Sequence, residues 1–153
     1  MSLRCLLDTN IASYYLRRAS TALEARVNHG LREQSLALSV LTRAELRFGQ
    51  AAMEAQDRRR RLIDLFLLQL PCLPWTSKAA DAYGTLEDAL RRAGRPIGEL
   101  DTLIAAHALA DGLTLVTHNV RHFADVAGLD VQDWMLGQDT LAKGRPKSRP
   151  PRA

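Results

Sequence analysis

The sequence predicts an α/β fold built around a mainly parallel sheet, and three observations lead to this prediction. Short apolar runs that end in polar residues alternate with longer segments of helical periodicity. The chain has 153 residues, of which 46% are hydrophobic and 25% charged, as expected for one globular domain with a core of its own. Its only uninterrupted run of large apolar residues, at 65–68, is far shorter than the ~20 residues that a membrane helix needs.

The first elements follow from where the apolar runs stop. Residues 4–7 form a short run that ends in Asp8-Thr9-Asn10, a sequence that stops a strand and caps a helix. Helical patterning then covers about 11–31 as one segment. The run 35–40 is bounded by polar residues, which is typical of a second, buried strand.

The middle of the chain is mostly helical. A helix is expected from about Thr42, and a long amphipathic helix spans 57–70, with four arginines crowded at its start. Prolines flank the apolar residues of 71–75, which predicts a brief strand at the edge of the sheet. A further helix is expected from Thr76 to about Ala93.

Residues 94–134 complete the alternation of predicted strands and helices. Residues 94–98 are typical of a loop and 99–110 of a helix that Gly112 ends. Strands are expected at 113–117 and 129–134. We therefore expect a folded domain over residues 1–136.

The remaining segment, 137–153, differs in composition. From Ala142 onward it holds five basic residues and no acidic one, and without that stretch the chain has 16 basic and 17 acidic residues. The tail is expected to be disordered, and Lys143, Arg145, Lys147 and Arg149 are candidate RNA contacts.

Two further observations concern the compartment. Cys5 and Cys72 both lie in apolar surroundings and are expected to be buried free thiols in a reducing environment. Asp8 interrupts the N-terminal apolar stretch before the hydrophobic region of a signal peptide could form. We expect a cytoplasmic protein that does not enter a membrane.

Several polar side chains follow the predicted strands. In a parallel sheet the carboxyl ends of the strands lie at one edge, where ligands bind. Asp8 follows the first strand, Glu45 lies just beyond the second, and Asp101 opens the helix that leads into the strand ending at Thr117. We expect these three carboxylates to meet there. Because clustered carboxylates repel one another, they favour a cation such as Mg²⁺ or Mn²⁺.

Each acidic residue also has an ordinary structural explanation. Asp8 is suited to cap the following helix, and Glu45 stands three residues after Thr42, the spacing of a capping box. Asp101 lies in a first helical turn, where the helix dipole favours negative charge.

Four segments together resemble PIN domains, and in order and spacing they are most similar to the VapC toxins of type II toxin–antitoxin systems. These segments are 6–10, 39–46, 101–108 and 115–123, and the resemblance extends over about residues 3–135. It implies an α/β/α sandwich with a mainly parallel sheet and a Mg²⁺-dependent ribonuclease activity, in which Mn²⁺ can substitute. It also implies an RNA substrate, a cognate antitoxin and a homodimer formed through the helices in 11–31 and 42–70.

The resemblance assigns roles by matching motifs. Asp8, Glu45 and Asp101 match the three acidic metal-site positions, with Asp8 and Asp101 as direct ligands and Glu45 binding through water or orienting the attacking water. Thr9, Asn10 and Thr117 match supporting positions.

The fourth position departs from the family pattern. Many PIN domains carry Asp where this chain has Asn119, and relatives with Asn there often have an acid where His122 stands. Asn119 is expected to contact the phosphate or a water, and a second metal would be held weakly.

Other interpretations remain open from the sequence. Arg58, Arg59, Arg60 and Arg61 are either a solvated helix face or a contact to the RNA backbone. His118 and His122 have the spacing of a zinc pair but lack its sequence context. The alternative functions are phosphoryl transfer with Asp8 as nucleophile and a non-catalytic binding module that retains the PIN fold.

Overall fold

The computed structural model describes residues 2–136, which form a five-stranded sheet with strand order β3-β2-β1-β4-β5. All four strand pairings are parallel. The strands are β1 (Cys5–Leu7), β2 (Leu36–Ser39), β3 (Cys72–Leu73), β4 (Thr114–Val116) and β5 (Val131–Gln132). The α/β prediction and the positions of all five strands are thus confirmed. The predictions for the tail, including Lys143, Arg145, Lys147 and Arg149, lie outside the described residues.

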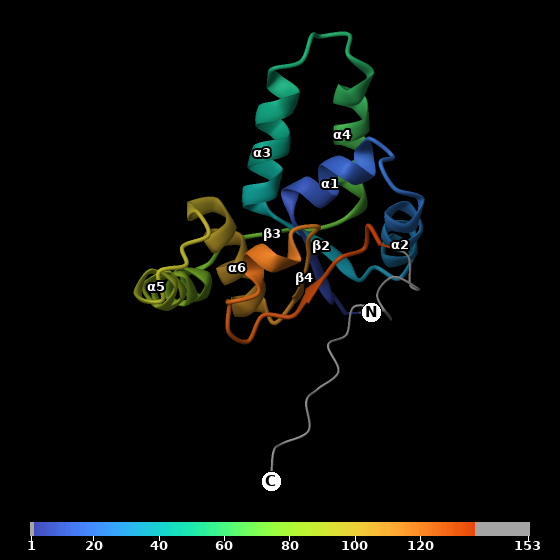
Figure 1. The fold of residues 1–153 in the computed structure, drawn as a ribbon. Helices are drawn as coiled ribbons and strands as arrows, with labels where there is room; N and C mark the ends of the chain where they lie inside the picture. The colour runs from blue at the N-terminus through green and yellow to red at the C-terminus, as the bar shows by residue number, and fades with distance from the viewer. Residues whose placement is uncertain (1, 137–153) are drawn as a thin grey trace.

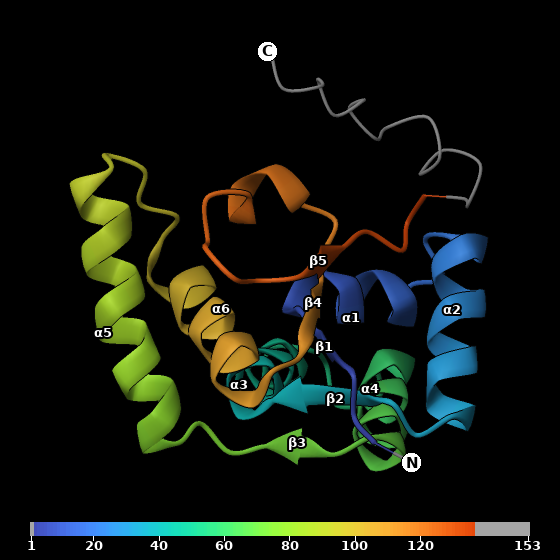
Figure 2. The same cartoon turned by 90° about the horizontal axis from the view of Figure 1, so that it is seen from below.

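Helices cover both faces of the sheet, as the sandwich prediction requires (Figures 1 and 2). One face carries α1 (Thr9–Leu16), α2 (Thr21–Arg32), α3 (Val40–Ala51) and α4 (Arg58–Gln69). The other carries α5 (Ser77–Arg92), α6 (Glu99–Asp111) and the 3₁₀ turn η1 (Val120–Phe123).

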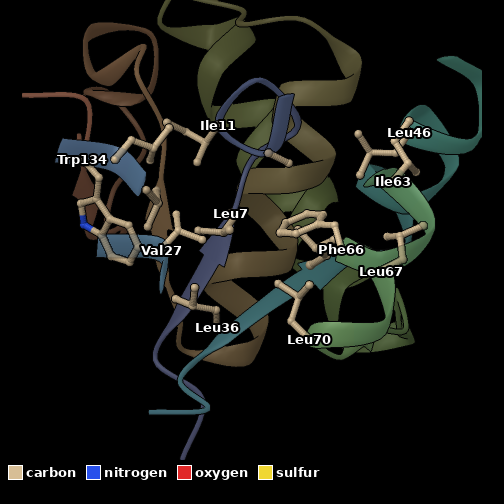
Figure 3. Packing of buried hydrophobic residues seen from close by; sticks show 14 residues of the cluster. Leu7, Ile11, Val27, Leu36, Leu46, Ile63, Phe66, Leu67, Leu70 and Trp134 are labelled. Carbon is tan, nitrogen blue, oxygen red and sulfur yellow. The ribbon is translucent and has the colours of Figure 1, made fainter. Parts of the chain in front are cut away.

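Successive residues of β1 contribute to two separate cores because side chains alternate across a strand. Leu7 points into the core beneath α1 to α4, together with Ile11, Val27 and Phe66 (Figure 3). Leu6 points the opposite way, into the core beneath α5 and α6. Both leucines are fully buried, so β1 is covered on each face.

The single helical segment expected over 11–31 is wrong: the structure has two helices, α1 and α2. The chain turns at Arg18, whose φ of 54° is left-handed, and Ser20 caps the new helix by accepting a hydrogen bond from the Leu23 amide at 3.2 Å. The break contains no Gly or Pro, so its sequence signal is weak.

α3 and α4 stand side by side and project beyond the sheet (Figure 1). The Arg60 guanidinium ties their connection together by donating to the Gln50 and Met53 carbonyls at 2.7 and 3.2 Å. Arg60 therefore contacts the carbonyl end of α3, where a positive charge is favourable. Arg59 pairs with Asp57, and Arg58 and Arg61 are exposed.

Cys5 and Cys72 are free thiols, as expected, but both are half-buried rather than buried. His107 is fully buried in α6, and its Nδ1 lies 2.8 Å from the Ser39 hydroxyl at the end of β2, so it is a packed core histidine. Among the described residues, no helix is both long enough and apolar enough to cross a membrane.

Gly30 provides a test of this packing. A Cβ at Gly30 would lie 2.7 Å from Cγ of the buried Leu36, because α2 lies close against β2 at this point. We expect Gly30→Ala to lower the free energy of unfolding by about 1–3 kcal/mol through overpacking.

The matched control is Gly84→Ala in α5, where a Cβ meets nothing within 4 Å. It should raise the free energy of unfolding by about 0.5–1 kcal/mol, because alanine favours the helix. Urea unfolding measures both, and effects of the same sign would contradict the close packing of α2 on β2.

Candidate active site

The carboxyl ends of β1, β2 and β4 gather the residues that the sequence singled out. Asp8 directly follows β1, and Thr117 directly follows β4, its parallel neighbour. Ser39 ends β2 and caps α3, and Glu45 lies midway along that helix. Asp101 comes from the first turn of α6, on the other side of the sheet.

Asp8 is the buried member of the group, with only 8% of its surface exposed. Its Oδ1 accepts a hydrogen bond from the Ile11 amide at 2.7 Å, so the capping interpretation of Asp8 is confirmed. Thr117 also donates a hydrogen bond to the carboxylate.

The charge on Asp8 is nevertheless unfavourable. Burial raises the pKa of Asp8 above its ordinary value, and the nearby charges of Asp101 and Glu45 raise it further. The hydrogen bonds from Thr117 and Ile11 act on the pKa in the opposite direction but do not overcome burial. The three carboxylates are therefore close enough to act on one another electrostatically.

The Glu45 side chain contacts Thr9, the residue next to Asp8, rather than the N-terminus of its own helix, α3. The Thr9 hydroxyl makes a hydrogen bond to Glu45 Oε1 and lies 3.2 Å from the hydroxyl of the fully buried Thr42. The capping-box interpretation of Thr42 and Glu45 is wrong, because α3 starts at Val40 and Ser39 is its cap.

Asp101 is paired with a histidine. Its Oδ2 lies 2.8 Å from His122 Nε2, which also lies 2.7 Å from the Ile97 carbonyl. Since both partners accept hydrogen bonds, Nε2 carries a proton in this arrangement. His122 thus supplies a donor to Asp101 at the position where the family pattern has an acid.

Asn119 and Asn10 are both exposed at this edge. The Asn119 amide donates to Thr117 Oγ1 at 3.1 Å, so Thr117 joins Asn119 to Asp8. The side chain of Asn10 lies with Thr9 and Glu45 along a groove of about 370 Å³ between α1, α3 and α4. Arg17 and Arg59 also line this groove.

The donor set fits a hard divalent cation, because it consists of carboxylate oxygens whose mutual repulsion a cation would relieve. Over residues 2–136, however, no three His, Cys, Asp or Glu side chains lie close enough to share a metal ion. Glu45 is held by Thr9 and Asp101 by His122. Both side chains would have to turn from these partners to approach Asp8.

The sequence did not reveal the partners of these acids. Thr42 lies within one of the motifs, but its buried contact with Thr9 spans 33 positions. The sequence marks His122 only as a departure from the family pattern, and its contact with Asp101 depends on how η1 packs against α6. His118 and His122 contact different carboxylates, Asp133 and Asp101, rather than forming a pair.

The raised pKa of Asp8 predicts a stability effect. Because the pKa of Asp8 is higher in the folded than in the unfolded chain, the folded state keeps its proton to higher pH. The free energy of unfolding therefore falls as pH rises above the ordinary aspartate range and Asp8 ionises. We expect Asp8→Asn, which can still cap α1, to unfold at the same or a higher temperature at pH 7.

The gain should shrink as pH falls through the raised pKa of Asp8, because the wild-type carboxyl then becomes protonated as well. Thermal unfolding of both proteins in EDTA across this pH range measures the difference. A variant less stable than wild type at pH 7 would show that the Asp8 charge stabilises the fold.

Comparison with known proteins places this architecture in a family. The PIN domain model matches residues 5–129. The tRNA(fMet)-specific endonuclease VapC of Shigella flexneri is 33% identical over 132 residues, which cover 86% of this chain and 98% of the relative. Ribonuclease VapC2 of Haemophilus influenzae is 35% identical over 133 residues, covering 87% and 99%.

Solved structures agree with the sequence comparisons. The VapBC2 structure from Rickettsia felis, bound to a promoter DNA fragment, matches with a TM-score of 0.79 at 29% identity and covers 88% of this chain and 99% of the other. A DNA-bound VapBC structure from Salmonella typhimurium also matches with a TM-score of 0.79, at 30% identity and with coverage of 86% and 98%. The chain therefore belongs to the PIN domain family and, within it, is related over nearly the whole length of its relatives to the VapC ribonucleases of toxin–antitoxin systems.

Proposed function

We propose that this protein is a Mg²⁺-dependent endoribonuclease that hydrolyses RNA phosphodiester bonds and acts as the toxin of a toxin–antitoxin pair. The observation that carries the proposal is the buried Asp8, whose ionised form is opposed by burial and by the charges of Asp101 and Glu45. Acids arranged at a cost to the fold favour a functional role over a purely structural one. The relatives named as ribonucleases support the reaction class.

The residues divide between binding and orientation. A divalent cation bound here would neutralise the scissile phosphate and activate a water. Asp8 and Asp101 are the proposed ligands. Glu45 orients the attacking water once its carboxylate has turned from Thr9 toward Asp8. Asn119, exposed beside Thr117, donates to a phosphate oxygen.

The partners follow from the relatives and from the surface. The related structures from Rickettsia felis and Salmonella typhimurium are VapBC complexes, which supports a cognate antitoxin for this chain. Four large apolar side chains are exposed along α3 and α4: Phe48, Leu62, Leu65 and Leu68. An exposed apolar surface of this kind supports contact with another protein, here a second copy of the chain or the antitoxin. RNA as substrate and antitoxin as partner imply that the protein works in the cytoplasm.

One observation favours the alternative, a non-catalytic binding module. His122 holds Asp101 where the family pattern has a further acid, which reduces the negative charge available to a second cation. Metal-dependent cleavage distinguishes the two functions.

Asp101→Asn tests the proposed site. We expect it to lower Mg²⁺-dependent cleavage of a labelled RNA by more than about a hundredfold, since even outer partners of metal ligands contribute about 10- to 100-fold. The matched control is Asp88→Asn, an equally charged change on α5, where Asp88 is 63% exposed and pairs only with Arg92 among the described residues. Mn²⁺ should support wild-type cleavage, and EDTA should abolish it.

A second measurement separates metal binding from catalysis. Mg²⁺ should raise the melting temperature of the wild type and of Asp88→Asn, but raise that of Asp101→Asn less, because ligands that bind the native state stabilise it. Full cleavage by Asp101→Asn at saturating Mg²⁺ would rule out the site. A wild type that binds RNA without cutting it in either metal would establish the binding module instead.

The basic tail is proposed to add affinity for RNA that does not depend on sequence. Truncation after Leu141 removes five cations from a chain whose remainder is near neutral. We expect weaker RNA binding at low salt and a weaker dependence of the binding constant on salt. The slope of its logarithm against the logarithm of salt concentration should fall by about 0.7 for each phosphate that the shorter chain no longer neutralises. The cut site should stay the same, because Asp8, Glu45 and Asp101 all lie within the folded domain. Equal affinities of both proteins across a salt series would show that the tail has no role in binding.

A further inference from the structure

Beside the acidic site, α1 runs next to the ends of β4 and β5 (Figure 2). A histidine and a carboxylate meet at this place: His118, which follows Thr117, has its Nδ1 2.9 Å from Oδ2 of Asp133, which follows β5. Asp133 is only 8% exposed, and its other oxygen accepts a hydrogen bond from the Met135 amide at 2.9 Å. Neither residue has a part in the proposed hydrolysis.

The contact with Asp133 determines which imidazole nitrogen is available. A carboxylate accepts hydrogen bonds, so Nδ1 of His118 carries the hydrogen and donates it. In the neutral ring Nε2 is then an acceptor. The His118 side chain is 47% exposed, and its Nε2 has no hydrogen-bond partner within residues 2–136. His118 therefore presents an oriented acceptor to solvent next to the acidic site.

The surface around His118 continues away from that site along α1. The His118 ring stands edge-to-face against Tyr14, with centroids 5.9 Å apart and planes at 88°. The Arg17 guanidinium lies over the Tyr14 ring, 5.2 Å from its centroid. Asn10, Tyr14 and Arg17 are spaced four and three residues apart, which puts them on one side of the helix. They form a polar track with an aromatic ring at its middle and a cation at its far end.

We propose that His118 recognises the ribose of the substrate, with Nε2 accepting a hydrogen bond from a 2′-hydroxyl and so favouring RNA over DNA. This inference rests on the proposed function, since it assumes a nucleic-acid strand at the acidic site. Because Nδ1 is taken by Asp133, Nε2 is the ring nitrogen left for the substrate, and a hydroxyl can hydrogen-bond to it. The 2′-hydroxyl is the group by which a protein distinguishes RNA from DNA. Arg17 is the natural contact for a phosphate farther along the strand.

The test compares binding of a fluorescent single-stranded RNA with its 2′-deoxy counterpart of the same base sequence, in EDTA so that no strand is cut. His118→Asn retains a donor near Nδ1 for Asp133 but has no atom at the place of Nε2. We expect it to weaken RNA binding about three- to tenfold, the contribution of one hydrogen bond, and to leave DNA binding unchanged. His118→Gln, whose amide oxygen reaches toward the place of Nε2, should recover part of the preference.

The matched control is His29→Asn, at an exposed histidine of α2, which should leave both affinities unchanged. Equal reductions of RNA and DNA affinity in His118→Asn would assign His118 to a phosphate and overturn the inference. An unchanged RNA-to-DNA ratio, or a wild type without any preference, would overturn it as well. Asp101→Asn should keep the preference while losing cleavage, so failure of the ribose contact is distinguishable from failure of the proposed reaction. A wild type that binds neither strand would overturn both.

Discussion

β1 is hydrogen-bonded to a parallel strand on each side, and apolar side chains cover both of its faces. The residue that follows it therefore has little access to water, and that residue is Asp8. An ionisable group at such a place raises the free energy of the folded chain unless it is compensated. The helix cap to Ile11 and the hydrogen bond from Thr117 give part of this compensation. The neighbouring acids act against it, so the position of Asp8 at the end of β1 is what raises its pKa.

The fold could be predicted largely because its signals are local. Each strand is a short apolar run that ends at a polar residue, and most helices have caps or breakers such as Thr76 and Gly112. The break between α1 and α2 could not be predicted because Arg18 takes a left-handed φ that glycine or asparagine usually marks. The approach of Glu45 and Asp101 toward Asp8 could be expected from topology, since parallel strands bring their carboxyl ends together, but among the described residues no three acids lie close enough to share a metal ion.

The contacts within the site were not predictable, because each joins residues that are far apart in the chain. Glu45 stands at capping-box spacing from Thr42, and only the approach of α1 to α3 shows that Thr9 is its partner. Arg60 belongs to a run of four arginines with no local feature to set it apart, yet among them it alone donates to the carbonyls that end α3. The pairing of His118 with Asp133 likewise depends on the adjacency of β4 and β5.

The two cores lie on opposite sides of the sheet, and the site draws one acid from each layer. Glu45 comes from α3, in the layer that contains α1 to α4, while Asp101 comes from α6 in the opposite layer. Asp8 lies between them at the end of the central strand. The position of Glu45 relative to Asp101 therefore depends on how both layers pack against the sheet. A substitution in either core is expected to change the distance between the two acids, even where the substituted residue touches neither of them.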